Sequence, residues 1–473
     1  ADWLGVKFCT ASSSGTAAIH TALGALQLEP GDEVICAPIT DMGTVIPVLA
    51  QNAIPVFADI LPETYNMDPV SAEQRVTART RAIMPVHLAG NPADMAALRD
   101  VAARHGLLLV EDCAQAYGAL WQGEKVGTLG DIGCFSLQQS KHLISGQGGL
   151  TVTNDPVLQE ILSIFPHKGG PHYSSLGARN YLQFGYNYHL TELQAAVALS
   201  QLPGLEALCV RRAFLGDRLN AKLAGLPGFY PQVVREGDRC TYWMYVLRVV
   251  AEEAAVPAPK VAEALRAEGV ACGYQYIGKP IFMYEAIRRQ QVYGTSNYPF
   301  TLRDGEPLRY DEEYCPGCVQ ALDEMVVIPI HELYTDEDID QIAEACAKIA
   351  TWAWKRLVGR LDQVQPIDRA RRAVITPLVG VRCVDPRLQR ARLGVDGHQA
   401  GRVGLVVVVA LQECMHLRPG IGRLLQVAVA AGVTAEDHLD VGRRLDQLVE
   451  QELRAVVAVA AVVLDQLTVA LQI

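Results

Sequence analysis

Residues 1–200 alternate short apolar runs with stretches of helical periodicity, and this alternation restricts the possible folds more than any other feature. The runs are rich in β-branched and bulky apolar residues and are bounded by turn residues, which is typical of buried strands. They are residues 6–10, 34–37, 55–58, 82–86, 107–111, 133–137 and 150–153. Helical patterns lie between them, for example at 17–26, 94–105 and 191–202. This order predicts an α/β layer architecture with a mostly parallel sheet.

The pattern changes after residue 204, within a chain of 473 residues that is long enough for two or three domains. A helical stretch at 205–223 leads to a break rich in Pro and Gly and then to a strand-like run at 244–250. Further helical patterns follow at 259–268 and 336–352. We therefore predict a large domain at 1–204 and a smaller C-terminal α/β domain at 205–355.

Residues 356–473 have an anomalous composition, because they contain no Ser, Lys, Asn, Phe, Tyr or Trp. Arg supplies every long cationic side chain, and Val, Leu and Ala dominate. One interpretation is a helical appendage with a loose amphipathic stripe. The other, which we favour, is GC-rich DNA read out of frame. No function is assigned to this tail.

Composition excludes several classes of protein. The net charge of −11 argues against nucleic acid as a partner. The 12 cysteines are scattered rather than spaced as a disulfide framework, which indicates a reducing cytoplasm. No secretory signal is visible, and no apolar run approaches the ~20 residues that span a bilayer. Cys315-Pro-Gly-Cys318 is a lone CxxC and a weak zinc signal, so we predict no metal.

Two residues at the ends of apolar runs carry the chemistry. Asp112 closes one predicted strand, and Lys141 lies in a polar loop that follows another. A pyridoxal phosphate (PLP) site needs this pair, because the lysine forms a Schiff base and the carboxylate keeps the pyridine nitrogen protonated. Taken singly, Asp112 also fits a helix cap and Lys141 a solvated surface residue. Their position at carboxyl ends of strands favours one shared cleft.

Other small and polar residues fit the same ligand. The stretch at 12–17, Ser-Ser-Ser-Gly-Thr-Ala, follows a strand and opens a helix, where backbone N–H groups and the helix dipole favour a phosphate. A plain N-cap by Ser or Thr is the alternative. Ser136, at a strand end before Lys141, is a second candidate for the phosphate, and Gln115 lies one helical turn beyond Asp112, near the ring hydroxyl.

Several segments, in this order, resemble the DegT/DnrJ/EryC1/StrS family of PLP-dependent sugar aminotransferases. They are SSSGTAAIHTAL (12–23), VHLAGNPADM (86–95), VEDCAQAYGA (110–119), GCFSLQQSKHLISGQGGLTVTND (133–155) and FGYNYHLTELQAAVALSQL (184–202). Weaker similarity continues through TYWMYVLRV (241–249), YIGKPIF (276–282), YCPGC (314–318) and IPIHELYTDEDI (328–339). The resemblance therefore covers residues 1–350, roughly.

The resemblance implies the aspartate aminotransferase-like fold of type I PLP enzymes, a homodimer, and an active site at the subunit interface. It implies Lys141 as the Schiff-base residue and proton shuttle, and Asp112 as the partner of the pyridine nitrogen. Cofactor-binding roles are further implied for Gly15, Thr16, Gln115, Ser136 and Asn187, the last from the partner subunit.

The chain departs from the family pattern at three places. His189 stands where the family often has arginine. The segment 39–44, where an aromatic residue often stacks on the cofactor ring, reads ITDMGT, so the stacking residue stays unnamed. The family's usual N-terminal segment is absent, and we expect upstream residues to be missing.

The expected reaction moves an amino group from glutamate or glutamine to the ketone of a nucleotide-linked keto-sugar or a cyclitol. Relatives that dehydrate carry histidine at the lysine position, so Lys141 favours transamination. Two alternatives stay open: a regulatory relative that binds PLP or a sugar nucleotide without turnover, and an inactive truncated product. Tyr173, Tyr186, Tyr188, Tyr242 and Trp243 are candidates for a sugar site, but packing is the simpler role for each.

Overall fold

The computed structural model describes residues 1–170, 180–305 and 307–362, with side chains up to residue 352. The chain divides into two compact units, Ala1–Thr351 and Trp352–Ile473. The described residues belong almost entirely to the first unit. The anomalous tail predicted at 356–473 lies outside the described residues, except for the end of one helix, and so does Tyr173.

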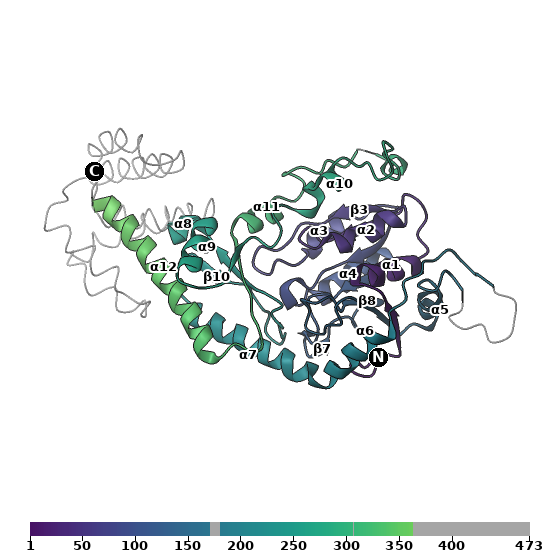
Figure 1. The fold of residues 1–473 in the computed structure, drawn as a ribbon. Helices are drawn as coiled ribbons and strands as arrows, with labels where there is room; N and C mark the ends of the chain where they lie inside the picture. Colours follow the sequence, from purple (N-terminus) through teal and green to yellow (C-terminus); the bar gives the residue numbers. More distant parts are fainter. Residues whose placement is uncertain (171–179, 306, 363–473) are drawn as a thin grey trace, which may run out of the picture. The chain divides into compact units, whose positions relative to one another are not determined.

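A seven-stranded sheet forms the centre of the first unit (Figure 1). Its strand order is β1-β9-β8-β5-β4-β2-β3. Neighbouring strands from β8 to β3 are parallel, whereas β9 is antiparallel to both β8 and β1. The strands are β1 Phe8–Ser12, β2 Glu33–Cys36, β3 Ile54–Phe57, β4 Thr80–Met84, β5 Leu108–Asp112, β8 Ile132–Ser136 and β9 Gly149–Thr153. Each coincides with an apolar run, which confirms the predicted, mostly parallel sheet.

The central strands are buried on both faces. Every residue of β2, β3 and β8 is buried, so these strands read as continuous apolar runs rather than alternating ones. Helix α1 (Gly15–Ala25) packs against α2 (Met42–Ala50), α5 (Pro156–Ile164), β8 and β9. Helix α4 (Met95–His105) packs against α3 (Pro69–Gln74), β4 and β5. These helices exclude water from the sheet.

Short polar side chains start the five helices of this layer. Each N-cap side chain accepts a hydrogen bond from a backbone N–H of the first turn, which satisfies donors that the helix itself leaves unpaired. The caps are Ser14, Asp41, Asp68, Asp94 and Asp155. The helix starts are therefore encoded locally.

Three strand ends meet at one edge of the sheet. Because β1 and β8 are both antiparallel to β9, they run in the same direction as each other and as β5. Ser12, Asp112 and Ser136 are the last residues of these strands. Ligands of open α/β sheets bind at the carboxyl ends of strands, so this edge is where a site is expected.

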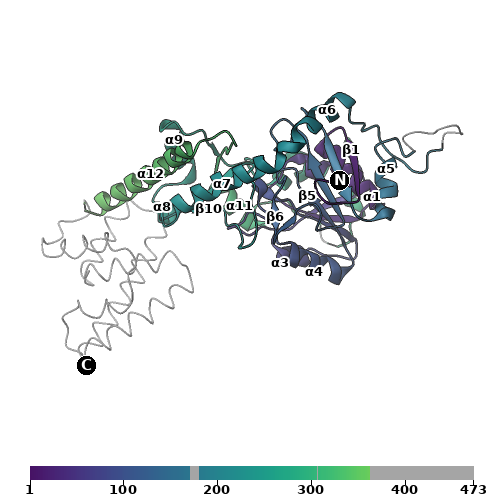
Figure 2. The same cartoon turned by 90° about the horizontal axis from the view of Figure 1, so that it is seen from below.

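A second, antiparallel sheet has the order β10-β11-β13-β12. Its own hydrophobic core includes residues of α7, α9 and α12. Arg218 of α7 pairs with Asp340 of α12 at 2.8 Å, and Figure 2 shows both helices. The elements are β10 Phe229–Pro231, β11 Tyr245–Val249, β12 Gly273–Tyr274, β13 Met325–Ile328, α7 Leu205–Leu223, α9 Ala258–Ala267 and α12 Asp336–Asp362.

The remaining described elements connect these two sheets or lie at their edges. Buried residues between Ile281 and Met325 pack in the core of the first sheet, not of the second. The domain boundary at 204 and 205 therefore stays a prediction. These elements are β6 Leu120–Trp121, β7 Glu124–Lys125, α6 Glu192–Gln201, α8 Ala251–Ala254, α10 Glu285–Arg288 and α11 Pro316–Asp323.

The CxxC motif lies at the start of α11 and is buried. Asp59 accepts hydrogen bonds from the backbone N–H groups of Gly317 at 2.8 Å and Cys318 at 2.7 Å. Burial raises the pKa of both thiols, so the protonated form is favoured at Cys315 and Cys318. The described cysteines are all free thiols. In this part of the chain the motif anchors α11 to the first core.

Candidate active site

Asp112 ends β5 with its carboxylate almost fully buried. Its Oδ2 accepts a hydrogen bond from Thr44 Oγ1 at 2.8 Å, and its Oδ1 accepts one from the Ala114 backbone N–H at 3.0 Å. Burial raises the pKa of Asp112, and the two hydrogen bonds and the charge of Lys141 oppose that rise. Among the described residues, no Lys, Arg or His forms an ion pair with this carboxylate within 4.0 Å. A positively charged group of a bound ligand would give the Asp112 carboxylate an ion-pair partner.

Lys141 lies in the turn after β8, and its amino group is near Asp112. Burial lowers the pKa of Lys141, while the negative charges of Asp112 and Asp41 raise it again. Its Nζ lies 4.0 Å from the centroid of the Trp243 ring. The structure thus brings together the two residues that the sequence identified as the chemical pair.

Ser136 and the start of α1 form a tight corner at the same edge. A Cβ placed on Gly15 would lie 2.7 Å from Ser136 Cβ and 2.9 Å from Ser136 Oγ, so only glycine fits there. Thr16 follows, and its Oγ1 lies 2.6 Å from where a Cβ on Gly43 would be. Ser14 is the N-cap of α1, and its side chain accepts a hydrogen bond from the Ala17 N–H. One serine of the 12–17 stretch therefore has the plain capping role. Gly15, Thr16 and Ser136 stay candidates for the phosphate.

Gln115 is anchored at both ends of its side-chain amide. Its Oε1 accepts from the Ala89 N–H at 2.8 Å, and its Nε2 donates to Tyr276 Oη at 3.1 Å. Burial raises the pKa of Tyr276, as do the charges of Asp41 and Asp112. Gln115 therefore links the Asp112 turn to the loop that carries Tyr276.

Asn187 and His189 lie outside this group in a single chain. Asn187 is exposed and pairs with His167 in an isolated antiparallel bridge. His189 Nε2 lies 2.6 Å from His167 Nδ1. Within the described part of the chain, the Asn187 side chain has no hydrogen bond to Lys141, Asp112 or Ser136. Its predicted role in a partner's site is consistent with that position and stays a prediction.

Sequence reasoning missed the roles of four residues around the pair: Asp41, Thr44, Trp243 and Tyr276. The segment 39–44 supplies no aromatic ring; instead Asp41 caps α2 and Thr44 binds Asp112. Trp243, for which packing was the simpler role, contacts Lys141, and its ring lies edge-on to Tyr276 with centroids 5.6 Å apart. The signal for these residues was weak, because they come from segments distant in sequence from Lys141.

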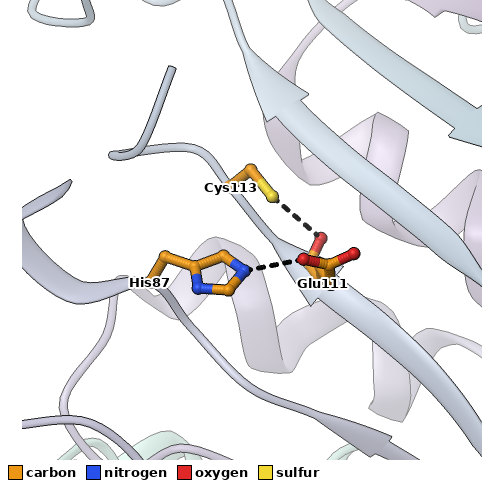
Figure 3. A group of neighbouring side chains, drawn as sticks. All are labelled: His87, Glu111 and Cys113. Carbon is orange, nitrogen blue, oxygen red and sulfur yellow. Dashed lines mark hydrogen bonds and ion pairs between the residues drawn. The ribbon is translucent and has the colours of Figure 1, made fainter. Parts of the chain in front are cut away.

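His87, Glu111 and Cys113 form a buried cluster (Figure 3), and two of its members are the sequence neighbours of Asp112. Its ligand atoms lie within 4.8 Å of one another, a spacing compatible with a metal ion. The Glu111 carboxylate, however, already accepts three backbone N–H bonds, from Gly127, Leu129 and Gly130, at 2.6–2.8 Å.

The histidine of this cluster is also fully engaged. His87 Nδ1 accepts from the Ala93 N–H at 3.0 Å, so its Nε2 carries the proton and donates to Glu111 at 2.9 Å. No lone pair of the imidazole is left for a metal. The cluster is a structural support that holds the 127–130 loop and the end of β5.

The family model described as DegT/DnrJ/EryC1/StrS aminotransferase family matches residues 1–347. The chain belongs to this family. That assignment confirms the expected α/β fold of type I aminotransferases.

Two relatives illustrate the family. A putative L-glutamine:3-amino-2,3-dideoxy-scyllo-inosose aminotransferase of Micromonospora echinospora is 36% identical over 359 residues, which are 73% of this chain and 83% of the relative. An L-glutamine:2-deoxy-scyllo-inosose aminotransferase of Streptomyces fradiae is 37% identical over 367 residues, 74% of this chain and 84% of the relative.

Solved structures show the same fold. DesV of S. venezuelae, solved in complex with a ketimine intermediate, has a TM-score of 0.63 and 29% identity, and the match covers 74% of this chain and 86% of DesV. An aminotransferase from Psychrobacter cryohalolentis has a TM-score of 0.64 and 26% identity, over 74% of this chain and 89% of its own.

Proposed function

We propose that this aminotransferase binds PLP at Lys141 and transfers an amino group from L-glutamine or L-glutamate to the ketone of a cyclitol or keto-sugar. One observation carries the proposal: a half-buried lysine and a buried carboxylate interact electrostatically at the carboxyl edge of a mainly parallel sheet. Bound PLP supplies an electron sink for charge that develops at the carbon bearing nitrogen.

The residues present fit this cofactor. The Asp112 carboxylate is buried, has two neutral hydrogen-bond donors, and suits a protonated pyridine nitrogen as its cationic partner. Gly15 and Ser136 approach each other at the N-terminus of α1, where a phosphate is favoured by free backbone N–H groups and the helix dipole. We assign the phosphate to Gly15, Thr16 and Ser136, and the ring neighbourhood to Asp112 and Gln115.

Lys141 acts as the base and acid of the reaction. Burial lowers the pKa of its amino group, which increases the fraction of neutral amine available to take a proton from Cα of the amino donor. The same nitrogen then returns that proton. Asp112 keeps the proton on the pyridine nitrogen, and the Thr44 hydrogen bond favours the charged form of Asp112 that this task requires.

The relatives support the substrate class. The named relatives use L-glutamine as donor and inososes, which are cyclitol ketones, as acceptors. By similarity we propose L-glutamine and a polyhydroxylated ring ketone for this chain. A nucleotide-linked keto-sugar is the second candidate for the acceptor. The retained Lys141 and Asp112 favour turnover over a regulatory role.

We also propose that the active unit is a homodimer. Helix α6 has no buried residue, and Leu193 and Leu199 on it are 82% and 65% exposed. Phe184, which precedes it, is 78% exposed. Such an apolar surface is typical of a subunit interface. In the dimer, Asn187 of one subunit would serve the phosphate of the other, with His189 in place of the more usual arginine.

The stretch Glu192–Leu223 is long and apolar enough to cross a membrane by length and composition, with a mean hydropathy of 1.3. We assign it to the dimer instead, because Pro203 interrupts it and Arg211 and Arg218 form ion pairs with α12. We accordingly propose a cytoplasmic enzyme without a membrane or nucleic-acid partner.

Absorption spectroscopy tests the proposal. The purified chain is mixed with PLP, and the Schiff-base band is followed after addition of L-glutamine or L-glutamate. We expect the band to form, and to bleach with the amino donor, in the native chain. The Lys141→Ala variant should fold normally but show neither change. A band that persists in Lys141→Ala, or an active variant, would refute the assignment.

A further inference from the structure

Two consecutive residues of the lysine turn are bound by one tryptophan. The Trp243 indole Nε1–H donates to the Ser140 carbonyl oxygen at 2.6 Å. The face of the same indole lies under the ammonium group of Lys141, with Nζ 4.0 Å from the ring centroid. This distance is within the range of a cation–π interaction, for which Trp is the strongest partner. The edge and the face of one side chain thus contact the lysine and its neighbour.

The backbone that carries this indole is itself fixed. The Trp243 N–H donates to the Ala89 carbonyl at 2.8 Å, and the Trp243 carbonyl accepts from Arg212 Nη2 at 3.0 Å. Tyr242 before it has a φ of 41°, in the left-handed region that non-glycine residues adopt only when their surroundings hold them there. The indole is therefore a rigid platform rather than a mobile surface side chain.

The other neighbour of the lysine is attached to the same segment. The buried His142 ring donates through Nε2 to the Thr241 carbonyl at 3.1 Å. Burial lowers the pKa of His142 to about 3, so the ring is neutral. Residues 241–243 therefore bind both sequence neighbours of the lysine, Ser140 and His142. The indole of the same segment also lies beneath the lysine amino group.

Charges around Lys141 come from several elements. Asp112 at the end of β5 and Asp41 at the start of α2 attract the ammonium group. Tyr276 in the loop after β12 and His142 are neutral near pH 7. Arg212 on α7 is paired with Glu332 at 2.9 Å behind the Trp243 carbonyl. The indole face is thus an uncharged group that attracts the ammonium form of Lys141 in addition to these charges.

We propose that Trp243 is a positioning residue for Lys141: its face holds the ammonium group when the lysine is free, and its N–H fixes the turn at Ser140. The inference rests on the proposed role of Lys141 as the residue that binds PLP. In its proposed role the neutral amine of Lys141 takes a proton from Cα and is an ammonium group until it returns that proton. During this interval a cation–π contact with Trp243 would keep the ammonium group in place, in addition to the attraction of Asp112 and Asp41.

The proposal predicts the sign of a pKa change in the PLP-free chain. Removing the aromatic face withdraws an attraction for the ammonium form, so the pKa of Lys141 should fall by about one unit in Trp243→Leu, a tenfold change in the ratio of protonated to neutral amine. A merely structural effect has the opposite sign, because a smaller side chain admits water and relieves the burial that now lowers the pKa.

Competitive acetylation measures this quantity. The rate at which Lys141 of the PLP-free chain reacts with acetic anhydride is followed against pH by mass spectrometry. Trp243→Phe keeps a smaller aromatic face and loses the indole N–H, so it should retain most of the native pKa of Lys141. Trp3→Leu is the matched control, because Lys125 Nζ lies 4.0 Å from the Trp3 ring. That variant should leave Lys141 unchanged.

An unchanged or raised pKa of Lys141 in Trp243→Leu would overturn the proposal. A fall in Trp243→Leu with recovery in Trp243→Phe would support it. The same variants are then loaded with PLP and the pH titration of the Schiff-base band is compared. If the native chain formed no Schiff base, the proposed function would fail, whereas the labelling result would stand independently.

Discussion

A threonine relay that ends on Asp112 gives a quantitative test of the site. Because the Thr44 hydroxyl hydrogen points to Asp112 Oδ2 at 2.8 Å, the Thr40 hydroxyl at 2.6 Å must donate to Thr44. Thr44→Val removes the donor to the carboxylate and nearly preserves the shape of the side chain. Thr40→Val removes the outer bond alone and is the matched control.

The magnitude follows from the charge of the acceptor. A hydrogen bond to a charged group contributes about 1.5–3 kcal/mol, and one to a neutral group about 0.5–1.5 kcal/mol. Their difference, about 1 kcal/mol, corresponds to an upward shift in the pKa of Asp112 of somewhat under one unit. Asp112 has a raised pKa in the folded state, so its contribution to stability is largest below the unfolded pKa and falls as pH rises through the folded pKa.

Thr44→Val should therefore cost about 2 kcal/mol of unfolding free energy above the folded pKa of Asp112, where the carboxylate is charged. Below that pKa the cost should fall to about 1 kcal/mol. Urea unfolding of the PLP-free chain at a series of pH values, which extends to both sides of the folded pKa of Asp112, measures both values. An equal cost at the two pH values, or the same pH dependence in Thr40→Val, would show that the bond to the carboxylate is not the cause.

Three further substitutions test other parts of the structure. Asp41→Asn should lower the pKa of Lys141, because a nearby negative charge is lost while the cap of α2 is kept. Competitive acetylation measures this pKa, and the control Asp68→Asn, at the cap of α3, should leave it unchanged. Glu111→Gln should cost about 3 kcal/mol in urea unfolding, since its amide would turn a donor toward backbone N–H groups, and a cost below ~1 kcal/mol would contradict the support role. Leu193→Glu should shift the chain from dimer to monomer in analytical ultracentrifugation, whereas Leu333→Glu, at an equally exposed leucine, should leave the dimer intact.

The layer architecture was predictable because its signals are local. Apolar runs bounded by turn residues marked all seven strands of the large sheet, and two of the predicted helices begin at short polar residues, Asp94 and Thr191, that cap helices in the structure. Strands β10 and β12 were not found, because two or three residues carry too little periodicity, and β13 was missed as well. The packing of residues 281–325 against the first sheet was also missed, since it depends on contacts between distant segments.

The chemical pair was predictable for the same reason, and its surroundings were not. Asp112 and Lys141 could be recognised from their residue types and from their positions at the ends of apolar runs. Parallel strands bring side chains at such positions to the same edge of the sheet. Thr44, Tyr276 and Trp243 look like ordinary polar or packing residues in the sequence. Each acquires its role only through a contact with a residue far along the chain.

The sequence by itself determined the sheet, the lysine, the buried carboxylate and the family. The tertiary structure decided which side chains tune that pair: a hydroxyl that supports the carboxylate and an indole that lies beneath the ammonium group. It also decided that His87, Glu111 and Cys113 form a support rather than a metal site. The physical reason is that neighbouring residues determine the patterns that indicate strands and helices. The hydrogen bonds and ring contacts of the site depend instead on which distant segments the fold brings together.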